Sequence, residues 1–184
     1  DLQKDSFHFL FLAWNLALAW IPLLISHYLS QKPRSKWIVS ISVFCWLLFF
    51  PNAPYLITDF VHLQVRTGIP LWYDILLLFT YAILGLALGI RSLEQLRQYL
   101  HHHWGHRLAH LLVGTTLLLS GLGIYLGRVL RWNSWDAIVN PWGPIQDTLQ
   151  LLMNPIENWQ AWLMITGFSL ALSTYYWVMQ SGKT

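Results

Sequence analysis

Charged residues are scarce in this sequence. Asp, Glu, Lys and Arg together make up 10% of the 184 residues, against about one quarter in a soluble domain, and 55% of the residues are hydrophobic. A chain with so few polar groups has little with which to cover a water-exposed surface. The composition therefore excludes an ordinary soluble domain.

Cysteines and continuous basic stretches are also lacking. Cys45 is the one cysteine, so the chain has no internal disulfide and gives no indication of redox compartment. The Lys and Arg residues lie in short segments between apolar runs rather than along one surface. We therefore exclude nucleic acid as a partner.

Long apolar runs are what the sequence has instead. Five of them approach the roughly 20 residues that a helix needs to cross a bilayer. They are Phe7 to Leu29, Trp37 to Phe50 with a continuation beyond Pro51, Trp72 to Leu93, Leu108 to Leu126, and Trp159 to Met179. Twelve Trp and eight Tyr supply the aromatic rings that favour the membrane–water interface. The sequence predicts an all-α, polytopic transmembrane helix bundle of about five spans, a single domain over residues 1–184 with the lipid bilayer as its partner.

Charge alternates between the connections of these spans. The basic connections contain Lys32, Arg34, Lys36, Arg91, Arg97, Arg107 and Lys183, with Glu94 as their one acid. The other connections contain Asp1, Asp5, Asp59, Asp74, Asp136, Asp147 and Glu157, beside Lys4, Arg66, Arg128 and Arg131. Because basic connections resist translocation, we expect the N-terminus outside and the C-terminus in the cytoplasm of a bacterial inner membrane, or the equivalent arrangement in a thylakoid.

The segment from Trp132 to Asn158 is too polar to cross the bilayer. Within it, apolar residues recur at helical spacing with polar residues between them. The apolar residues are Ile145, Leu149, Leu152 and Met153, and the polar ones are Gln146, Asp147 and Gln150. This pattern is typical of an amphipathic helix that lies along the interface. We expect the segment to cover the outer mouth of the bundle as a lid.

Proline and glycine predict how the helices bend and pack. Pro51 and Pro54 remove amide donors and predict a break in the second span, an unwound turn near the outer interface. Two pairs of glycines spaced four apart favour close packing of the third and fourth spans as a hairpin. These pairs are Gly85 with Gly89 and Gly123 with Gly127.

Acids on the predicted outer side form the strongest candidate site. An acid near the hydrocarbon region costs roughly 2.5 kcal/mol or more, so it requires a partner, water or a ligand. Asp59 and His62 are three residues apart on one helix face, and together with Asp74 they have the donor types that bind a divalent metal ion. The full candidate polar site consists of Asn52, Tyr55, Asp59, His62, Asp74, Arg128, Arg131, Asn133 and Asp136.

Architectural roles stay open for the same residues. Asn52 can cap a helix, and Asp59 can pair with an arginine. Asp74 lies near a helix N-terminus, where the helix dipole favours a carboxylate. Asn133 and Asp136 match a capping box. The two outer arginines can equally extend toward the lipid headgroups.

The histidine-rich segment and Asn15 are interpreted as structural rather than functional. The histidines between the third and fourth spans are His101, His102, His103, His106 and His110. Three of them would align on one helix, but the segment contains Gly105 and lies on the basic side, so we interpret it as a solvated interfacial loop rather than a metal site. Asn15, in the middle of the first span, is expected to hydrogen-bond to another helix.

Two motifs on the outer side carry a family resemblance. The first is Phe50-Pro51-Asn52-Ala53-Pro54-Tyr55 with Thr58-Asp59 and His62, and the second is Gly127-Arg128 with Arg131 and Asn133-Ser134-Trp135-Asp136. In both, the chain resembles an uncharacterised family of small bacterial multi-pass membrane proteins, domain of unknown function 1361. The resemblance covers the whole chain and implies a bacterial membrane protein, with no activity attached.

Three functions are compatible with these observations. The first is a site at the outer face that binds a metal ion or a small or lipid ligand beneath the lid, with enzymatic chemistry as an open extension. The second is a structural or accessory subunit that contacts other membrane proteins. The third, transport of an ion or proton, is less favoured because few polar residues continue inward from Asp59.

Overall fold

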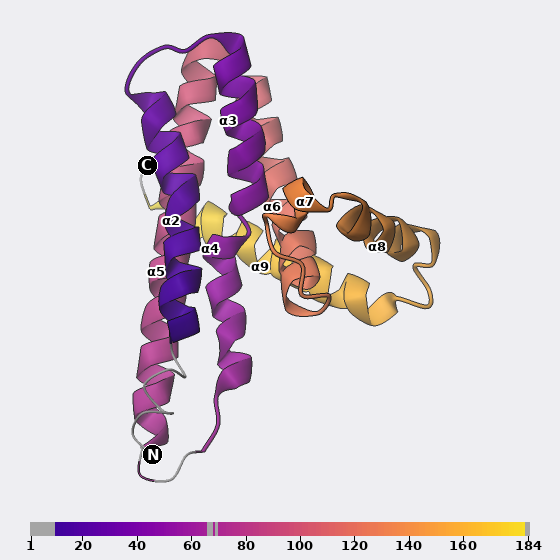
Figure 1. Cartoon of the computed structure of the whole chain (residues 1–184). Coiled ribbons are helices and arrows are strands. Elements are labelled where there is room, and N and C mark those ends of the chain that lie inside the picture. The colour runs from indigo at the N-terminus through magenta and orange to yellow at the C-terminus, as the bar shows by residue number, and fades with distance from the viewer. Residues whose placement is uncertain (1–9, 66–67, 69, 183–184) are drawn as a thin grey trace. The chain divides into compact units, whose positions relative to one another are not determined.

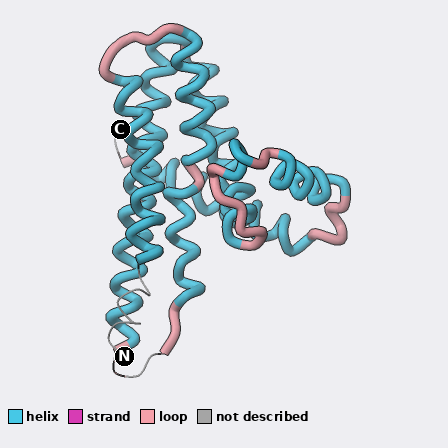
Figure 2. Tube along the Cα trace, viewed as in Figure 1, coloured by secondary structure: helices cyan, strands magenta, loops and turns pink. Residues whose placement is uncertain are grey.

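The computed structural model of the chain describes residues 10–65, 68 and 70–182. No strand occurs in these ranges, and the tube in Figure 2 consists of helices and loops. The all-α prediction is confirmed. The chain forms two compact units, Asp1–Tyr99 and Leu100–Thr184, and the single-domain prediction stays a prediction.

The first unit contains the helices that the N-terminal half of the sequence predicts. They are α2 (Leu10–Ser30), α3 (Lys36–Phe49), α4 (Asn52–Tyr55), the 3-10 helix η1 (Leu56–His62) and most of α5 (Leu71–Trp104). Helix α2 packs against α3, α4 and η1 (Figure 1). Ala19 of α2 meets Ala53 and Leu56 in a fully buried apolar cluster. The part of the first predicted span before Leu10 lies outside the described residues.

The break in the second span forms where the prolines predict it, but it is not unwound. Helix α3 ends at Phe49, and Pro51 keeps a helical backbone with φ −60° and ψ −20°. The amide of Ala53 donates to the carbonyl of Phe50 at 3.1 Å, which is a tighter turn than an α-helical one. The side chain of Asn52 donates to the carbonyl of Phe49 at 2.9 Å. A side-chain amide thus satisfies a carbonyl at the helix end, so the chain has no need to unwind.

The glycine pair on α5 has its neighbours in the first unit. A Cβ on Gly85 would meet the carbonyl oxygen of Ala53 and the side chain of Leu56, and a Cβ on Gly89 would lie 3.2 Å from the Cβ of Ala53. The pair therefore packs on α4 and η1 within the first unit, and the hairpin of the third and fourth spans stays a prediction. The short, proline-bounded α4 presents Ala53, a small residue, so the two backbones approach closely.

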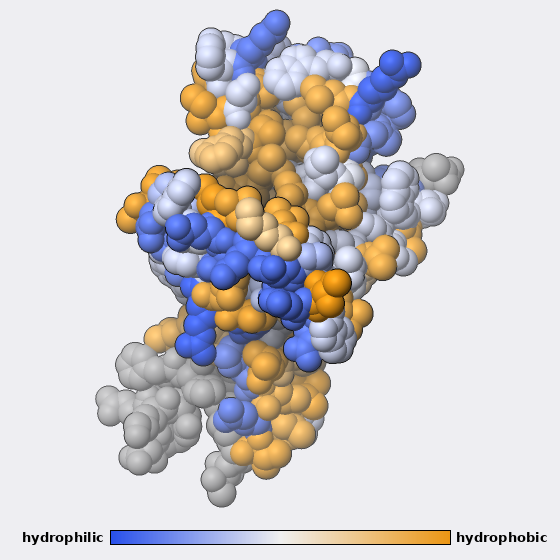
Figure 3. Space-filling model, turned by 90° about the vertical axis from the view of Figure 1, so that its right-hand side faces the viewer, coloured by the Kyte–Doolittle hydropathy of each residue, from blue (hydrophilic) through white to orange (hydrophobic). Residues whose placement is uncertain are grey.

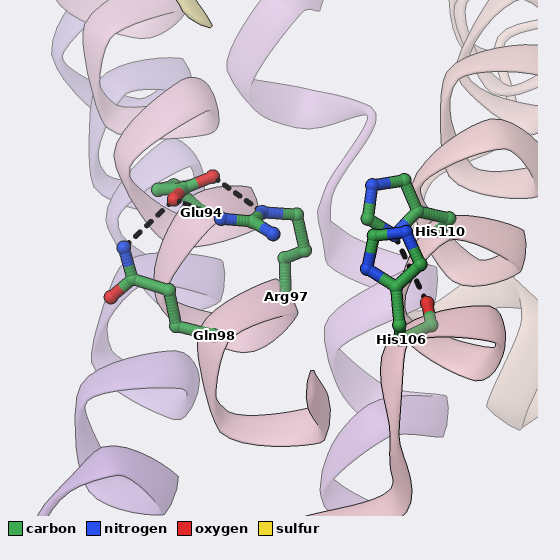
Figure 4. Close-up of polar contacts among 5 residues, drawn as sticks. All are labelled: Glu94, Arg97, Gln98, His106 and His110. Atoms are coloured by element: carbon green, nitrogen blue, oxygen red, sulfur yellow. Dashed lines mark hydrogen bonds and ion pairs between the residues drawn. The ribbon is translucent and has the colours of Figure 1, made fainter. Parts of the chain in front are cut away.

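Helix α5 is much longer than the predicted third span. It runs for 34 residues, or about 51 Å at roughly 1.5 Å per residue, instead of ending at Leu93. Between Leu93 and Gly105 the sequence contains no glycine or proline. Glu94 and Arg97 form a bidentate ion pair at 2.7 and 2.9 Å, and Gln98 donates to the same carboxylate at 2.8 Å (Figure 4). These pairs, spaced three and four residues apart, stabilise the helix beyond the apolar run.

The second unit consists of α6 (His106–Arg128), α7 (Asp136–Val139), α8 (Trp142–Met153) and α9 (Trp159–Ser181). The hydroxyl of Ser169 on α9 donates to the carbonyl of Leu118 at 3.0 Å, and a Cβ on Gly121 would meet the carbonyl of Ile165. Later positions on α6 therefore face earlier positions on α9. The two helices pack antiparallel, and Gly121 permits their close approach.

Four helical segments in the described part of the chain are long and apolar enough to cross a membrane. They are Leu10–Ser30, Lys36–His62, Leu71–Trp104 and His106–Arg128. Large apolar side chains are exposed along them, such as Leu24 at 59% and Phe44 at 64%, as expected for surfaces that face lipid. These properties identify an integral membrane protein.

Helix α9 corresponds to the fifth predicted span. It has 23 residues, no charged side chain, three Trp and two Tyr, and it is not one of the four segments named above. Its Trp and Tyr residues lie toward its two ends, where interfacial rings anchor a membrane helix. Its crossing of the bilayer stays a prediction.

Candidate functional site

A reversal of the chain after α6 positions the segment that follows. Arg131 adopts a left-handed backbone with φ +61°, and the amide of Trp132 donates to the carbonyl of Leu126 at 3.0 Å. The Trp132 indole then donates to Oδ2 of Asp147 on α8 at 2.7 Å. A Cβ at position 143 would clash with the ring of Trp132, so glycine at this position allows the ring to pack closely. One tryptophan thus fixes α8 by a hydrogen bond and by close packing.

Helix α8 is held against α9 by a second tryptophan. The indole of Trp162 donates to the carbonyl of Leu151 at 3.3 Å. Leu151, Ala161 and Ile165 are buried together, with Leu122 of α6 packed against them. The predicted amphipathic helix is therefore present as α8, packed on α9 within the second unit. Its position over an outer mouth of the bundle stays a prediction.

An apolar cavity of about 580 Å³ lies between α6, α8 and α9. Its volume is in the range of roughly 300 to 1,000 Å³ that is typical of ligand cavities. The lining residues come from all three helices and are Leu118, Leu119 and Leu122 of α6, Thr148, Leu151 and Leu152 of α8, and Trp162, Ile165, Thr166, Ser169, Leu170 and Ser173 of α9.

The hydroxyl groups in this wall all donate to backbone carbonyls. Thr148 donates to Pro144 at 2.7 Å, and Thr166 donates to Trp162 at 2.7 Å. Ser169 donates to the carbonyl of Leu118 at 3.0 Å, and Ser173 donates to the carbonyl of Ser169 at 2.7 Å. Since their donors are used internally, these side chains present mainly carbon to the cavity. The wall suits an alkyl chain better than a polar ligand.

A smaller, polar cavity of about 260 Å³ adjoins the apolar one. Leu151 lines both cavities. The other lining residues are Tyr125, Leu130, Asp147, Gln150, Asn154, Glu157 and Asn158. Figure 3, viewed onto the side on which α8 lies in Figure 1, shows hydrophilic and hydrophobic residues next to each other. Helix α8 thus borders a carbon-lined space along one face and a polar space along the next.

The first unit contains a separate buried polar contact. Asp59 of η1 is 1% exposed, and Nδ2 of Asn15 on α2 donates to its Oδ2 at 3.2 Å. The prediction that Asn15 bonds to another helix is confirmed. The hydroxyl of Thr58 donates to the carbonyl of Tyr55 at 2.6 Å. Asp59 thus faces the interior of the unit rather than lipid, as expected for a membrane carboxylate.

The other predicted metal ligands have different environments. His62 is exposed, and its ring packs edge-on against the ring of Phe11 with centroids 4.9 Å apart. Asp74 is 2% exposed in the first turn of α5. Across the residues with described positions, no group of three or more His, Cys, Asp or Glu side chains is arranged to hold a metal ion. The metal site of Asp59, His62 and Asp74 stays a prediction.

Asn133 and Asp136 make part of the predicted capping box. The backbone amide of Asn133 donates to Oδ2 of Asp136 at 2.7 Å, and the Asn133 side chain donates to the same oxygen at 3.2 Å. This is the half of the box in which the later residue reaches back to the earlier amide. Arg131 is exposed and Arg128 is partly exposed. Asp136 therefore has a structural role at the start of α7.

The histidines lie in helices rather than in a loop. The last turn of α5 contains His101, His102 and His103, and Gly105, with φ +93°, separates this helix from α6. The rings of His106 and His110 lie with centroids 3.9 Å apart, and Nδ1 of His110 is 3.0 Å from the carbonyl of His106 (Figure 4). The loop interpretation is wrong because only Gly105 interrupts the helical pattern. The predicted alignment of His102, His106 and His110 on one helix is also wrong, because Gly105 separates α5, which contains His102, from α6, which contains the other two.

Sequence reasoning selected the segment from Trp132 to Asn158 but missed the residues of α6 and α9 that line the two cavities. Leu118, Leu122 and Ile165 are ordinary residues of membrane helices, and nothing in their spacing marks them as cavity-lining. The one signal is the amphipathic pattern of α8, whose polar and apolar faces meet at Leu151. A helix with two such faces indicates that it borders two different environments.

Comparison with known families identifies the chain's relatives. The family model described as "Protein of unknown function (DUF1361)" matches residues 14–175, which is most of the chain. The chain therefore belongs to this family. No curated protein and no solved structure matches it.

Proposed function

We propose that this integral membrane protein binds a membrane lipid, or a lipid-linked molecule, in the cavity between α6, α8 and α9. The apolar cavity of about 580 Å³ is the observation that carries the proposal. Its wall has no spare donor among the four hydroxyls, so a polar solute would lose its hydrogen bonds to water there without replacement. An acyl chain has no such bonds to lose.

The order of residues along the helices supports the same ligand. On α6, Leu118 and Leu122 line the apolar cavity, and Tyr125, nearer the helix end at Arg128, lines the polar one. On α9, the polar lining begins at Asn158 before the helix and the apolar lining follows along it. Because α6 is long and apolar enough to span the membrane, its end lies near the interface and its middle lies in the hydrocarbon. The polar cavity therefore lies at headgroup depth and the apolar cavity at tail depth.

A second candidate site surrounds Asp59 in the first unit. The buried carboxylate and its hydrogen bond from Asn15 favour a small polar ligand or a proton there, on the outer side of a bacterial inner membrane with the N-terminus outside. A divalent metal would need donors beyond Asp59. An enzymatic role, and a role as accessory subunit of a larger membrane complex, are extensions that no geometry in the described residues favours over lipid binding.

The lipid proposal is tested by filling the apolar cavity. Thr166→Trp places an indole in the cavity, and its native hydroxyl bonds only within its own helix, so the loss of that group changes little else. Leu163→Trp is the matched control, because Leu163 is on the same helix, is 64% exposed and does not line the cavity.

Native mass spectrometry of gently solubilised protein measures the co-purifying lipid. We expect bound lipid in the wild type and in Leu163→Trp, and its loss in Thr166→Trp. Equal lipid retention in Thr166→Trp and Leu163→Trp would overturn the proposed site. Circular dichroism of each variant verifies that the helical content is unchanged.

A further inference from the structure

We infer that the two adjoining cavities bind a phospholipid whose headgroup carries a primary ammonium, as ethanolamine phospholipids do. This inference rests on the proposed function and specifies its ligand. The apolar cavity takes part of an acyl chain, and the polar cavity beside Leu151 takes the ammonium end of the headgroup.

The apolar cavity alone does not select among lipids. Lipid tails are as apolar as leucine, so a chain that leaves the bilayer for this cavity gains little hydrophobic free energy. Its lining on α9 extends from Trp162 to Ser173, or roughly 16 Å at about 1.5 Å per residue, which is enough for part of one chain. Every phospholipid with such a chain fits it equally, so selectivity has to come from the polar cavity.

The polar cavity has the charge that an ammonium group requires. Asp147 and Glu157 line it, and its eight lining residues include no Lys, Arg or His. Oδ2 of Asp147 is fixed by the hydrogen bond from Trp132, so this carboxylate is held in place before a ligand arrives. Two carboxylates without a cation among the lining residues repel an anionic headgroup and attract a cationic one.

The neutral lining residues add hydrogen-bond acceptors. The side-chain amides of Gln150, Asn154 and Asn158 and the hydroxyl of Tyr125 surround the same space. Nδ2 of Asn158 donates to the carbonyl of Asn154 at 2.9 Å. With that donor used locally, the carbonyl oxygen of the Asn158 amide remains available as an acceptor. A primary ammonium has three N–H donors, whereas a quaternary choline group has none.

Leu151 joins the two compartments into one amphipathic site. Leu151 is 4% exposed. Its backbone carbonyl accepts a hydrogen bond from the indole of Trp162, a residue that lines the apolar cavity. Both cavities therefore share one rigid wall residue. A ligand that occupies both must change from apolar to polar at that residue, as a phospholipid does between its chains and its headgroup.

The test uses the purified full chain, delipidated and then offered phospholipids with identical acyl chains. The headgroups compared are ethanolamine, choline and glycerol, and native mass spectrometry measures the bound fraction of each. We expect ethanolamine to be preferred over choline and glycerol by about tenfold or more, since a charge-assisted hydrogen bond is worth at least that ratio.

Two neutral substitutions test the source of the preference. The double variant Asp147→Asn with Glu157→Gln removes both charges but retains an acceptor for the Trp132 indole, and we expect it to bind all three lipids alike. Asp136→Asn is the control, because it makes the same chemical change in the same unit outside both cavities. It should keep the preference of the wild type.

The outcomes separate this inference from the proposed function. Binding of all three lipids to the wild type without preference, or a preference for the anionic glycerol headgroup, overturns the ammonium inference and leaves lipid binding intact. A preference that survives in the double variant also overturns it. Failure of every lipid to bind overturns both.

Discussion

Gly121 controls the distance between α6 and α9, and substituting it tests the frame of the proposed lipid site. In Gly121→Ala, the new methyl group would lie against the carbonyl of Ile165 and the hydroxyl of Ser169. The serine side chain can rotate, but the carbonyl belongs to the α9 backbone and cannot move without the helix. The two helices must therefore separate, or α6 must rotate.

The expected cost follows from overpacking. Inserting a group into a well-packed contact costs about 1 to 3 kcal/mol, and displacing the Ser169 hydroxyl weakens its hydrogen bond to Leu118, worth about 0.6 kcal/mol on average in membrane proteins. Alanine also favours a helix over glycine by about 1 kcal/mol. Gly114→Ala, on the same helix with nothing near the new methyl group, receives the same helix benefit without the clash.

The difference in the free energy of unfolding between these two variants isolates the cost of overpacking at Gly121. Equilibrium unfolding in a denaturing detergent, followed by circular dichroism, measures the free energy of unfolding of each. We expect Gly121→Ala to be less stable than Gly114→Ala by about 1 to 3 kcal/mol. Equal stability would refute the close antiparallel packing of α6 and α9, and with it the cavity between them.

Three further predictions concern other parts of the chain. Asn15→Leu removes one donor to the buried Asp59 and should lower the free energy of unfolding by about 1 to 3 kcal/mol, measured in the same detergent assay; an unchanged value would show that this bond contributes nothing. Trp132→Phe removes the hydrogen bond to α8 and should speed amide exchange in that helix about tenfold or more, measured by hydrogen exchange; unchanged exchange would contradict the anchoring role. In a cysteine-free background in intact cells, an impermeant reagent should label Gln146→Cys but not Ser35→Cys, and the reverse result would reject the predicted orientation.

Much of the helical architecture is predictable because the bilayer imposes one strong physical requirement. Backbone amides and carbonyls in hydrocarbon must bond within their own helix, so apolar runs of sufficient length become helices. The break at Pro51 and Pro54 follows from missing amide donors, and the inward direction of Asp59 follows from the cost of a carboxylate in lipid. Asn15 had to find a partner on another helix for the same reason.

The unpredicted features depend on distances between side chains. Helix α5 continues past Leu93 because the Glu94–Arg97 pair stabilises it beyond the apolar run. Gly85 faces α4 because Ala53 leaves space there, which no local pattern encodes. The two cavities arise from how α8 rests on its neighbours, and the leucines around them do not differ in sequence from leucines that face lipid.

Photocrosslinking with a phospholipid that carries a diazirine in its acyl chain tests the central claim most directly. After irradiation in vesicles and proteolysis, mass spectrometry of the peptides locates the labelled residues. The account predicts saturable labelling concentrated on residues 118–122 of α6 and 162–173 of α9, which excess unlabelled lipid displaces and Thr166→Trp abolishes. Labelling spread over all lipid-facing helices in proportion to probe concentration, unaffected by competitor, would contradict it.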